Sequence, residues 1–538
     1  MAANGDPEVL VSARPTEASA IAQSYSSKPF FLACVFVLQM LFLGFVALHR
    51  FVDGDEGFYL LASRLVLQHK KLYLDFLYEQ GPLLPYVYAL CMKFFGISWN
   101  AARLFAAFLT ALAGTLAYEE VCRQTRNRFA GATAAILFSA STLIFGFFPV
   151  AKTYSLAGLL VFAAYFAVSR LSFTSSGWLS ATSGLLFAFS VDTRSYLLVL
   201  FPLFLWWIIR GSQPDRRWRQ SLWFIGGCFV GVLPSLYYFA LSPGIFLFNN
   251  IGCHAIRSDS GLVGGWQQKV FVLLQAFLGG PEANGIQGSI LFFVALGLMS
   301  LIGKRRYPPR FAFQIAVVIG LVSLLPTPVL PQYFCLCIPF LVVSAVCVAN
   351  DFYLGLESQR AKVLSLVAGV LLFGIYLAAP IPDFHRYIVT GVGVPWVKWA
   401  RNPADWKLQN VQEISQAIDE VAAPGEAVAS FWPGYIVQTR ANPFPGLETD
   451  YGLPLSTKLT AEQRARYHIL SEDEIDANFA AHNPRIVVLR NPDQVKGKIP
   501  LRKMIETEDA LRASLQTYGY KVVRSVNGES IWVYSPKQ

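Results

Sequence analysis

The chain has 538 residues, of which 54% are hydrophobic and only 14% are charged, and its mean hydropathy is +0.44. This composition excludes an ordinary soluble protein and indicates a polytopic membrane protein. A net charge of +10 would suit a nucleic-acid binder in a soluble chain. Here many Lys and Arg residues fall in short loops between apolar runs, as the positive-inside rule describes, so we expect no nucleic-acid partner.

Residues 1–27 are small and polar and lack the apolar core of a signal peptide, so we expect a short disordered cytoplasmic tail. The region 28–385 then contains about eleven apolar runs that could span a membrane. Basic loops at 123–128, 216–219 and 304–310 all fall on the cytoplasmic side if the amino terminus does. The expected spans lie at about 30–50, 103–122, 129–148, 154–171, 178–192, 196–209, 221–241, 287–303, 311–326, 332–349 and 363–380.

The first loop on the expected outer side, residues 50–101, predicts two helices that lie in the membrane interface. EGFYLLASRLVLQHKK places Phe58, Leu61 and Leu65 on one helical face, and PLLPYVYALCMKFFG is a second such segment. We therefore expect this loop to be structured rather than a plain linker.

The same loop begins with DGDE, which puts Asp53, Asp55 and Glu56 directly after the first span. One explanation is helix capping, with Asp55 as the N-cap and Glu56 in the first turn. A cap needs only one carboxylate, however, so three of them at a membrane boundary favour a catalytic cavity that faces outward.

Residues 396–538 are charged and predict a soluble α/β domain on the outer side. A helical pattern covers 409–422, AVASFW and RIVVLR suggest strands, and Asn527-Gly528 is typical of a hairpin turn. The eight cysteines lie almost all in apolar runs and predict neither a disulfide framework nor a zinc site. We expect no metal and no cofactor.

Three segments in order, GDEGFYLLAS, YEQGPLLPYVYAL and FGISWNAARLFAA, resemble the GT-C superfamily of polyprenyl-phosphate-sugar-dependent glycosyltransferases. This superfamily includes the protein O-mannosyltransferases and the lipid A aminoarabinose transferases. Asp55-Glu56 matches its acidic pair, Gln80-Gly81-Pro82-Leu83 sits where many relatives have Lys-Pro-Pro-Leu, and Ala102-Arg103-Leu104 matches the Ala-Arg-Leu that opens the second span. The resemblance implies a GT-C-like fold and transfer of a sugar from a polyprenyl-phosphate-linked donor.

For the chemistry, the resemblance implies that Asp55 is the base that takes a proton from the acceptor hydroxyl. Glu56 would orient Asp55 or bind a sugar hydroxyl, and Asp53 could do either. Arg103 and Arg64 are further candidates, but an arginine on such a helix often pairs with a nearby acid, which for Arg64 would be Asp75 or Glu79.

The leaving polyprenyl phosphate needs fixed cations or a metal to stabilise its charge. Arg194 in VDTRSYLL sits where relatives carry Thr-Lys-Gly or Thr-Arg and resembles a phosphate ligand, although it could pair with Asp192 in a structural turn. Lys152 is either a second phosphate ligand or a snorkelling lysine. Several relatives have another acidic residue near this position, where the present chain has only Lys-Thr-Tyr-Ser, so a metal there is not expected.

The remaining substrate-binding candidates lie at other outer span ends and loops. Residues 242–285 contain His254, Arg257 and Asp259, which either shape the substrate entrance or belong to a merely polar surface loop. Gln332 and Tyr333 resemble the Arg-or-Gln-Tyr entry into a late span of the family, although a tyrosine there is often an aromatic-belt anchor. Gln80 completes the set of predicted substrate ligands.

Two other classes of protein compete with an enzyme. A transporter or flippase of a lipid-linked saccharide would also have about a dozen spans, but usually carries polar or broken segments near the membrane midplane. A receptor would not need so many spans. We therefore expect a multi-pass glycosyltransferase of the inner (plasma) membrane whose active site faces the periplasm, with a lipid-linked sugar donor, membrane lipids, and an envelope glycan, lipid or protein acceptor as partners.

Overall fold

The computed structural model describes residues 29–171, 176–257, 261–278, 289–302, 309–395, 402–490 and 502–535, together with 397 and 400, and every statement below concerns these residues. The predicted cytoplasmic tail, residues 1–27, lies outside the described residues, as does Asp259.

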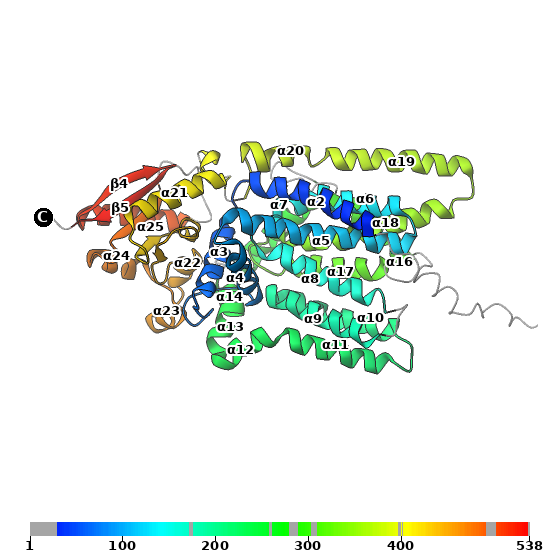
Figure 1. The fold of residues 1–538 in the computed structure, drawn as a ribbon, viewed down its shortest axis with the longest axis horizontal. Coiled ribbons are helices and arrows are strands. Elements are labelled where there is room, and N and C mark those ends of the chain that lie inside the picture. The colour runs from blue at the N-terminus through cyan, green and yellow to red at the C-terminus, as the bar shows by residue number, and fades with distance from the viewer. Residues whose placement is uncertain are drawn as a thin grey trace, which may run out of the picture.

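Most of the first 390 residues form a bundle of helices that run along the long axis of the molecule (Figure 1). Two 3-10 segments, η1 (Ser195–Leu200) and η3 (Pro331–Cys337), lead into α10 and α18. The bundle helices are α2 (Pro29–His49), α5 (Trp99–Thr125), α6 (Arg128–Ala140), α7 (Thr142–Phe147), α8 (Thr153–Val168), α9 (Gly177–Thr193), α10 (Phe201–Gly211), α11 (Arg217–Gly231), α12 (Leu233–Leu241), α16 (Ser289–Ile302), α17 (Pro309–Val322), α18 (Ile338–Gly355) and α19 (Gln359–Ala378).

Each apolar run of the sequence corresponds to one or two of these helices, but their lengths differ. Among the described residues, four helical stretches are long and apolar enough to cross a membrane: Pro29–His49, Trp99–Thr125, Pro331–Gly355 and Gln359–Thr390. A fifth arises if α11 and α12, which meet at a bend of 50°, count as one span. A multi-pass membrane protein is thus supported, and the count of eleven spans stays a prediction.

Local chemistry explains where the helices begin, end and approach each other. The connection between α5 and α6 is short because Arg126 adopts a left-handed conformation that ends α5, and the Asn127 side chain then accepts hydrogen bonds from Phe129 N and Ala130 N. Helices α9 and α11 pack closely because Gly184 and Gly227 face the partner backbone: a Cβ at either would lie 2.0 Å from a carbonyl oxygen.

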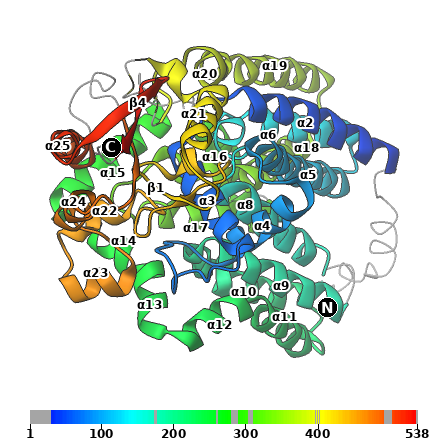
Figure 2. The same cartoon turned by 60° about the vertical axis from the view of Figure 1, so that its left-hand side comes forward.

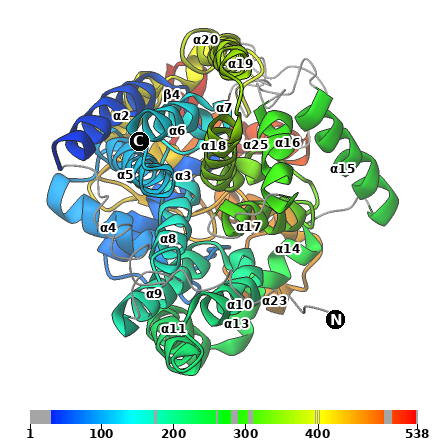
Figure 3. The same cartoon turned by 90° about the vertical axis from the view of Figure 1, so that its right-hand side faces the viewer.

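The segments between the bundle and the carboxyl-terminal part form a layer of short helices. In Figure 2, where the carboxyl-terminal elements come toward the viewer, α3 and α4 lie near the centre of the molecule, beside α8. Figure 3 shows α15, a helix that the sequence analysis did not anticipate, on the rim of the bundle. The layer consists of α3 (Gly54–Leu67), α4 (Leu83–Phe95), α13 (Pro243–Leu247), the π-helical η2 (Phe248–Gly252) and α14 (Cys253–Ile256), and the longer α15 (Gly261–Leu278) follows it in the chain.

The carboxyl-terminal part contains a mixed sheet of five strands in the order β2-β1-β3-β5-β4. Strands β2, β1 and β3 are parallel, whereas β5 runs antiparallel to both β3 and β4. The β4–β5 hairpin turns at Asn527 and Gly528, both with positive φ, as the sequence predicted. The strands are β1 (Ala427–Ser430), β2 (Asn442–Pro443), β3 (Ile486–Arg490), β4 (Tyr520–Val526) and β5 (Glu529–Tyr534).

Helical segments connect this sheet to the bundle and cover it. The predicted helix at 409–422 is confirmed as α21 (Leu408–Val421). The other helical segments of this part are α20 (Ile381–His385), η4 (Arg386–Thr390), η6 (Pro403–Trp406), η7 (Pro433–Ile436), α22 (Gly452–Ser456), α23 (Ala461–Tyr467), α24 (Glu472–Ala480) and α25 (Arg502–Thr517).

Helix α3 is buried nearly all round rather than on the one apolar face that the sequence predicted, because the carboxyl-terminal part covers its polar side. Arg64 donates to the carbonyl oxygens of Ile436 and Ala441, each at 2.5 Å, and so does not make the expected pair with Asp75 or Glu79. Trp432 Nε1 donates to the Gly54 carbonyl at 2.8 Å. These contacts fix the carboxyl-terminal part against the start of α3.

Candidate active site

Asp53, not Asp55, caps α3, which corrects the capping explanation considered above. Asp53 has extended backbone angles, and its Oδ1 accepts a hydrogen bond from Asp55 N at 3.2 Å. In return, Glu56 Oε1 accepts from Asp53 N at 2.9 Å, which completes a capping box. Asp55 is therefore left without a role in the cap.

Glu56 is fully buried, and each of its carboxylate oxygens accepts two hydrogen bonds. Oε1 accepts from Arg103 at 2.6 Å in addition to Asp53 N, and Oε2 accepts from Arg103 Nε at 2.9 Å and from Ala151 N at 3.1 Å. Arg103 also donates to the carbonyl oxygens of Ala47 and Arg50. Glu56 and Arg103 thus connect the end of α2, the start of α3, α5 and the turn before α8.

Lys152 joins the other two carboxylates. Its Nζ lies 2.9 Å from Asp53 Oδ1 and 2.7 Å from Asp55 Oδ2, and its side chain is only 2% exposed, so it does not snorkel. Burial raises the pKa of Asp53, but attraction to Lys152 and Arg50 outweighs burial and holds that pKa below its usual value. Of the three carboxylates, Asp55 has the most exposed side chain, at 14%.

Asp55 also contacts the carboxyl-terminal part. Tyr451 donates its hydroxyl to Asp55 Oδ1 at 3.0 Å, and its ring packs edge-on against Phe58 at 5.4 Å between centroids. Sequence reasoning missed Tyr451, because nothing in the local sequence TDYGL signals a contact with a residue 396 positions away.

Arg194 ends α9 and lies among aromatic rings rather than carboxylates. It donates to Thr153 Oγ1 at 2.6 Å, and its guanidinium lies 4.4, 5.2 and 5.8 Å from the ring centroids of Tyr154, Tyr196 and Tyr333. The alternative pairing with Asp192 is not formed, since Asp192 Oδ1 accepts from Ser235 instead. In the described part of the chain, no carboxylate pairs with Arg194, and its Nε has no hydrogen-bond partner.

The remaining candidates border the same region with fewer contacts. His254 Nε2 contacts the Glu79 carbonyl oxygen at 2.8 Å, and the Arg257 guanidinium lies 5.9 Å from the Tyr451 ring centroid. Gln332 and Tyr333 are both buried in η3. For Gln80, the carbonyl oxygen accepts a hydrogen bond from Tyr73 at 2.6 Å.

Two buried carboxyl groups near Asp55 and Arg257 were not predicted. Neither oxygen of the Glu79 carboxyl has a hydrogen-bond partner, and Asp450 Oδ1 has none either. Burial, together with the nearby charge of Asp450, raises the pKa of Glu79 to about 8, and burial together with the charge of Asp55 raises the pKa of Asp450 to about 7. Among the described residues, no cluster of three or more His, Cys, Asp or Glu side chains is arranged to hold a metal ion.

Comparison with known proteins bears on the fold. The model of the dolichyl-phosphate-mannose-protein mannosyltransferase family matches residues 79–238, which is less than half of the chain. No curated protein gives a significant match. The crystal structure of ArnT from Cupriavidus metallidurans bound to undecaprenyl phosphate matches with a TM-score of 0.63 and 14% identity, over 95% of this chain and 100% of ArnT.

The apo structure of the same ArnT matches over the same shares of both chains with a TM-score of 0.61 and 14% identity. At this identity the likeness shows the fold alone. The predicted resemblance to the GT-C superfamily is confirmed: the chain has the fold of an integral-membrane GT-C glycosyltransferase. Within that class, the particular fold is that of ArnT, which it matches along nearly its whole length.

Proposed function

We propose that the protein is a membrane glycosyltransferase that moves a sugar from a polyprenyl-phosphate donor to an envelope acceptor. The match of the mannosyltransferase family model supports the enzyme class, and the undecaprenyl phosphate bound to ArnT supports this type of donor. The acceptor is a glycan, lipid or protein that meets the enzyme on the side where residues 396–538 lie. We place that side outside the inner membrane, with the amino terminus in the cytoplasm.

The proposal rests on one observation: the three carboxylates have different partners. Asp53 caps α3, and Glu56 is paired with Arg103. Neither side chain is therefore available to take up a proton from a substrate. In the described part of the chain, only Lys152 and Tyr451 contact the Asp55 carboxylate, and the Asp55 side chain is partly exposed. Asp55 is therefore the base that accepts the proton of the acceptor hydroxyl.

Arg194 is the cation best suited to stabilise the leaving phosphate. The charge of Lys152 is already balanced by two carboxylates, so we assign it to positioning Asp55. Arg194 has no such partner in the described part of the chain and still has a free Nε donor. A buried guanidinium that faces developing negative charge lowers the barrier without reorganising water. Arg257, Tyr333, Gln332, His254 and Gln80 complete the surroundings of the donor.

The alternative, a transporter or flippase of a lipid-linked saccharide, fits the placement of charge less well. Among the described residues, buried charged side chains such as Glu56, Arg103, Lys152 and Arg194 lie within two turns of a helix end. A translocation path would instead need polar groups near the middle of the helices.

The test is donor turnover by the purified protein. Undecaprenyl-phosphate-linked sugars are supplied with an extract of envelope glycans and lipids, and release of free undecaprenyl phosphate is measured. We expect Asp55→Asn to lower release by about 10²–10⁴-fold, because an amide cannot accept the proton. Asp75→Asn is the matched control, since Asp75 is an exposed carboxylate of the same loop that accepts only from Lys71 N.

Two outcomes would contradict the proposal. An Asp55→Asn protein that keeps more than roughly a tenth of the release rate would move the base elsewhere. A wild-type protein that carries the intact donor across vesicle membranes without releasing undecaprenyl phosphate would be a flippase.

A further inference from the structure

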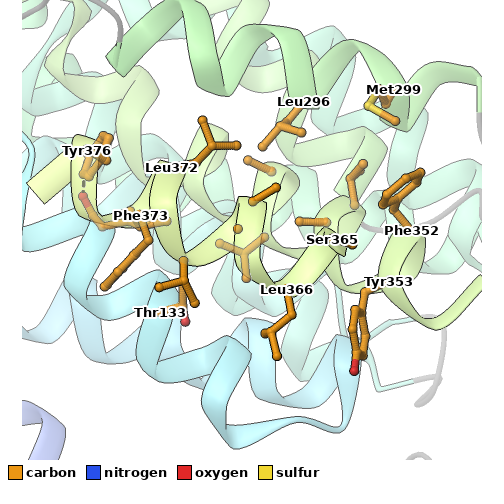
Figure 4. A pocket seen from close by; sticks show the side chains of 18 residues that line it. Thr133, Leu296, Met299, Phe352, Tyr353, Ser365, Leu366, Leu372, Phe373 and Tyr376 are labelled. Carbon is orange, nitrogen blue, oxygen red and sulfur yellow. Dashed lines mark hydrogen bonds between the residues drawn. The ribbon is translucent and has the colours of Figure 1, made fainter. Parts of the chain in front are cut away.

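Helix α19 stands apart from the rest of the bundle. Of its 20 residues, only Tyr376 is buried, and Figure 3 shows the helix at the outer edge of the bundle. Between α19 and the helices α6, α16 and α18 lies a cavity of about 610 Å³ (Figure 4). Its lining is mainly apolar and includes Leu137, Leu296, Ala345, Gly369, Leu372 and Phe373.

The residues that border the two ends of the cavity differ in exposure. Tyr376 closes the end nearer to α20, because its hydroxyl donates to the Leu137 carbonyl at 2.8 Å and its ring packs against Phe293 at 5.3 Å. The opposite end is bordered by Phe352 and Tyr353 at the end of α18, which are 52% and 36% exposed. The end of α18, which carries both of these exposed residues, lies on the side of the bundle that is remote from the carboxyl-terminal part and from the candidate active site (Figure 1).

A cation, Lys362, lies less than one helical turn before Ser365, the first residue of α19 that lines the cavity. With about 100° per residue along a helix, Lys362 lies within about 40° of Leu366 and about 20° of Gly369, so it shares the face of α19 that lines the cavity. Lys362 is half-buried, and in the described part of the chain no carboxylate pairs with it. The neighbouring charges are Arg360 and Glu357 on this end of α19 and its preceding loop, and Asp351 near the end of α18.

We propose that this cavity binds an acyl chain of an anionic phospholipid from the leaflet remote from the carboxyl-terminal part, with the phosphate at Lys362. The apolar lining suits a hydrocarbon chain, and basic pockets between membrane helices on one side of the bilayer bind anionic headgroups. The closed end at Tyr376 argues for a lipid that enters from this leaflet rather than for the tail of a donor held at Arg194. The site is independent of the proposed enzymatic function.

Two glycines of α19 provide a matched test of the cavity. A Cβ at Gly369 or at Gly374 would have no heavy atom within 4 Å, so either position accepts a larger side chain. Only Gly369 lines the cavity, and Gly374 lies about 140° away around the helix. In native mass spectrometry, wild type and Gly374→Phe should retain phosphatidylglycerol from mixed nanodiscs. Gly369→Phe should retain at least about tenfold less, because the phenyl ring fills the cavity and the acyl chain loses its packing contacts there.

Two cations of α19 provide a matched test of the headgroup. Lys362→Gln should lower the preference for phosphatidylglycerol over phosphatidylcholine about fivefold, the effect of one basic residue near an anionic surface. Arg360→Gln removes the same charge on the opposite face of the helix from Gly369 and should change the preference less than twofold.

Several results would overturn the proposal. They are equal lipid retention by Gly369→Phe and wild type, an unchanged lipid preference in Lys362→Gln, and a polyprenyl phosphate as the lipid that Gly369→Phe displaces. If Gly369→Phe does not accumulate, Gly369→Leu and Gly374→Leu give the same comparison. The wild-type protein alone gives a second readout: its Tm in detergent should rise more with added phosphatidylglycerol than with phosphatidylcholine, and an equal rise would contradict the proposed selectivity.

Discussion

Two neighbouring groups of buried polar residues flank Asp55 and differ in how their atoms are satisfied. On one side, the two Glu56 oxygens accept four hydrogen bonds from Arg103 and backbone amides. On the other side, Arg194 Nε, the Tyr196 hydroxyl, both Glu79 oxygens and Asp450 Oδ1 have no hydrogen-bond partner.

A buried polar atom without a partner costs about 1–3 kcal/mol, so the second group is expensive in the free protein. The first group holds the ends of α2, α3 and α5 together whether or not a substrate is present. We infer that the second group is completed by the substrate. Variants in the two groups should therefore fail in different ways, the first in stability and the second in activity.

The largest effect is expected in the satisfied group. Arg103→Met removes the close cationic partner of the buried Glu56 carboxylate and leaves it with the more distant Arg50 at 3.9 Å, which costs about 3–5 kcal/mol of unfolding free energy. Denaturant or thermal unfolding in detergent measures the loss. The double variant Arg103→Met with Glu56→Gln is the control and should recover a large part of it, because the side chain at position 56 is then neutral. A loss below about 1 kcal/mol for the single variant would mean that the Glu56–Arg103 pair contributes little to the stability of the fold.

In the unsatisfied group, Arg194→Ala should leave Tm close to wild type but lower donor turnover by about 10²–10³-fold, as loss of one transition-state charge donor does. Binding of undecaprenyl phosphate should weaken in parallel. Arg216→Ala is the control, since that side chain is 44% exposed and pairs only with its neighbour Asp215. Wild-type turnover in Arg194→Ala would argue against its contact with the phosphate.

The sequence predicted those features that depend on near neighbours. Apolar runs marked the helices of the bundle, and Asn527-Gly528 marked the hairpin because a turn with positive φ suits these two residues. The cap was misplaced by two residues, since Asp53 and Asp55 are equally good cap residues and only the direction of the chain after α2 decides between them. Helix α15 was missed because Gly264, Gly265 and the polar Gln267-Gln268-Lys269 interrupt its apolar pattern.

The sequence and the resemblance predicted Asp55, Lys152 and Arg194 as site residues. The structure places them around the start of α3 and the end of α9. Tyr451, Glu79 and Asp450 could not be found in this way. Their surroundings depend on how the carboxyl-terminal part docks on the first outer loop, and no local pattern encodes a contact across 396 positions.

Tyr451→Phe tests the hydrogen bond to Asp55, the residue that lies between the two groups. The change removes one hydrogen bond to the Asp55 carboxylate but keeps the ring against Phe58. We expect kcat to fall about tenfold with little change in KM, since a hydrogen bond to a charged group contributes about 1.5–3 kcal/mol and part of it is replaced by water. Tyr518→Phe is the control, because it removes a similar bond to Asp476 in the carboxyl-terminal part. Equal kcat values in the two variants would make the Tyr451 contact merely structural.

The last effect concerns the dependence of stability on pH, and it tests whether the unsatisfied carboxyl groups are neutral in the free protein. In the folded chain the pKa of Glu79 is about 8, against 4.5 for an unperturbed glutamate, so between these pH values the unfolded state has lost a proton that the folded state keeps. Stability therefore falls as pH rises through this window, by at most about 1.4 kcal/mol per pH unit and group, and levels off above it. Asp450 contributes a slope of the same sign between 3.8 and about 7.

Thermal unfolding of the substrate-free protein between pH 5 and pH 9 measures this slope. Glu79→Gln should flatten it up to about pH 8, and Asp450→Asn should flatten it only up to about pH 7, because an amide does not titrate and the two groups ionise in different windows. Glu357→Gln, which changes an exposed carboxylate beyond the other end of the bundle, should leave the slope as it is. A wild-type slope in both site variants would mean that these carboxyl groups are ionised in the free protein. Arg257 or Arg490, rather than a substrate, would then have to balance their charge.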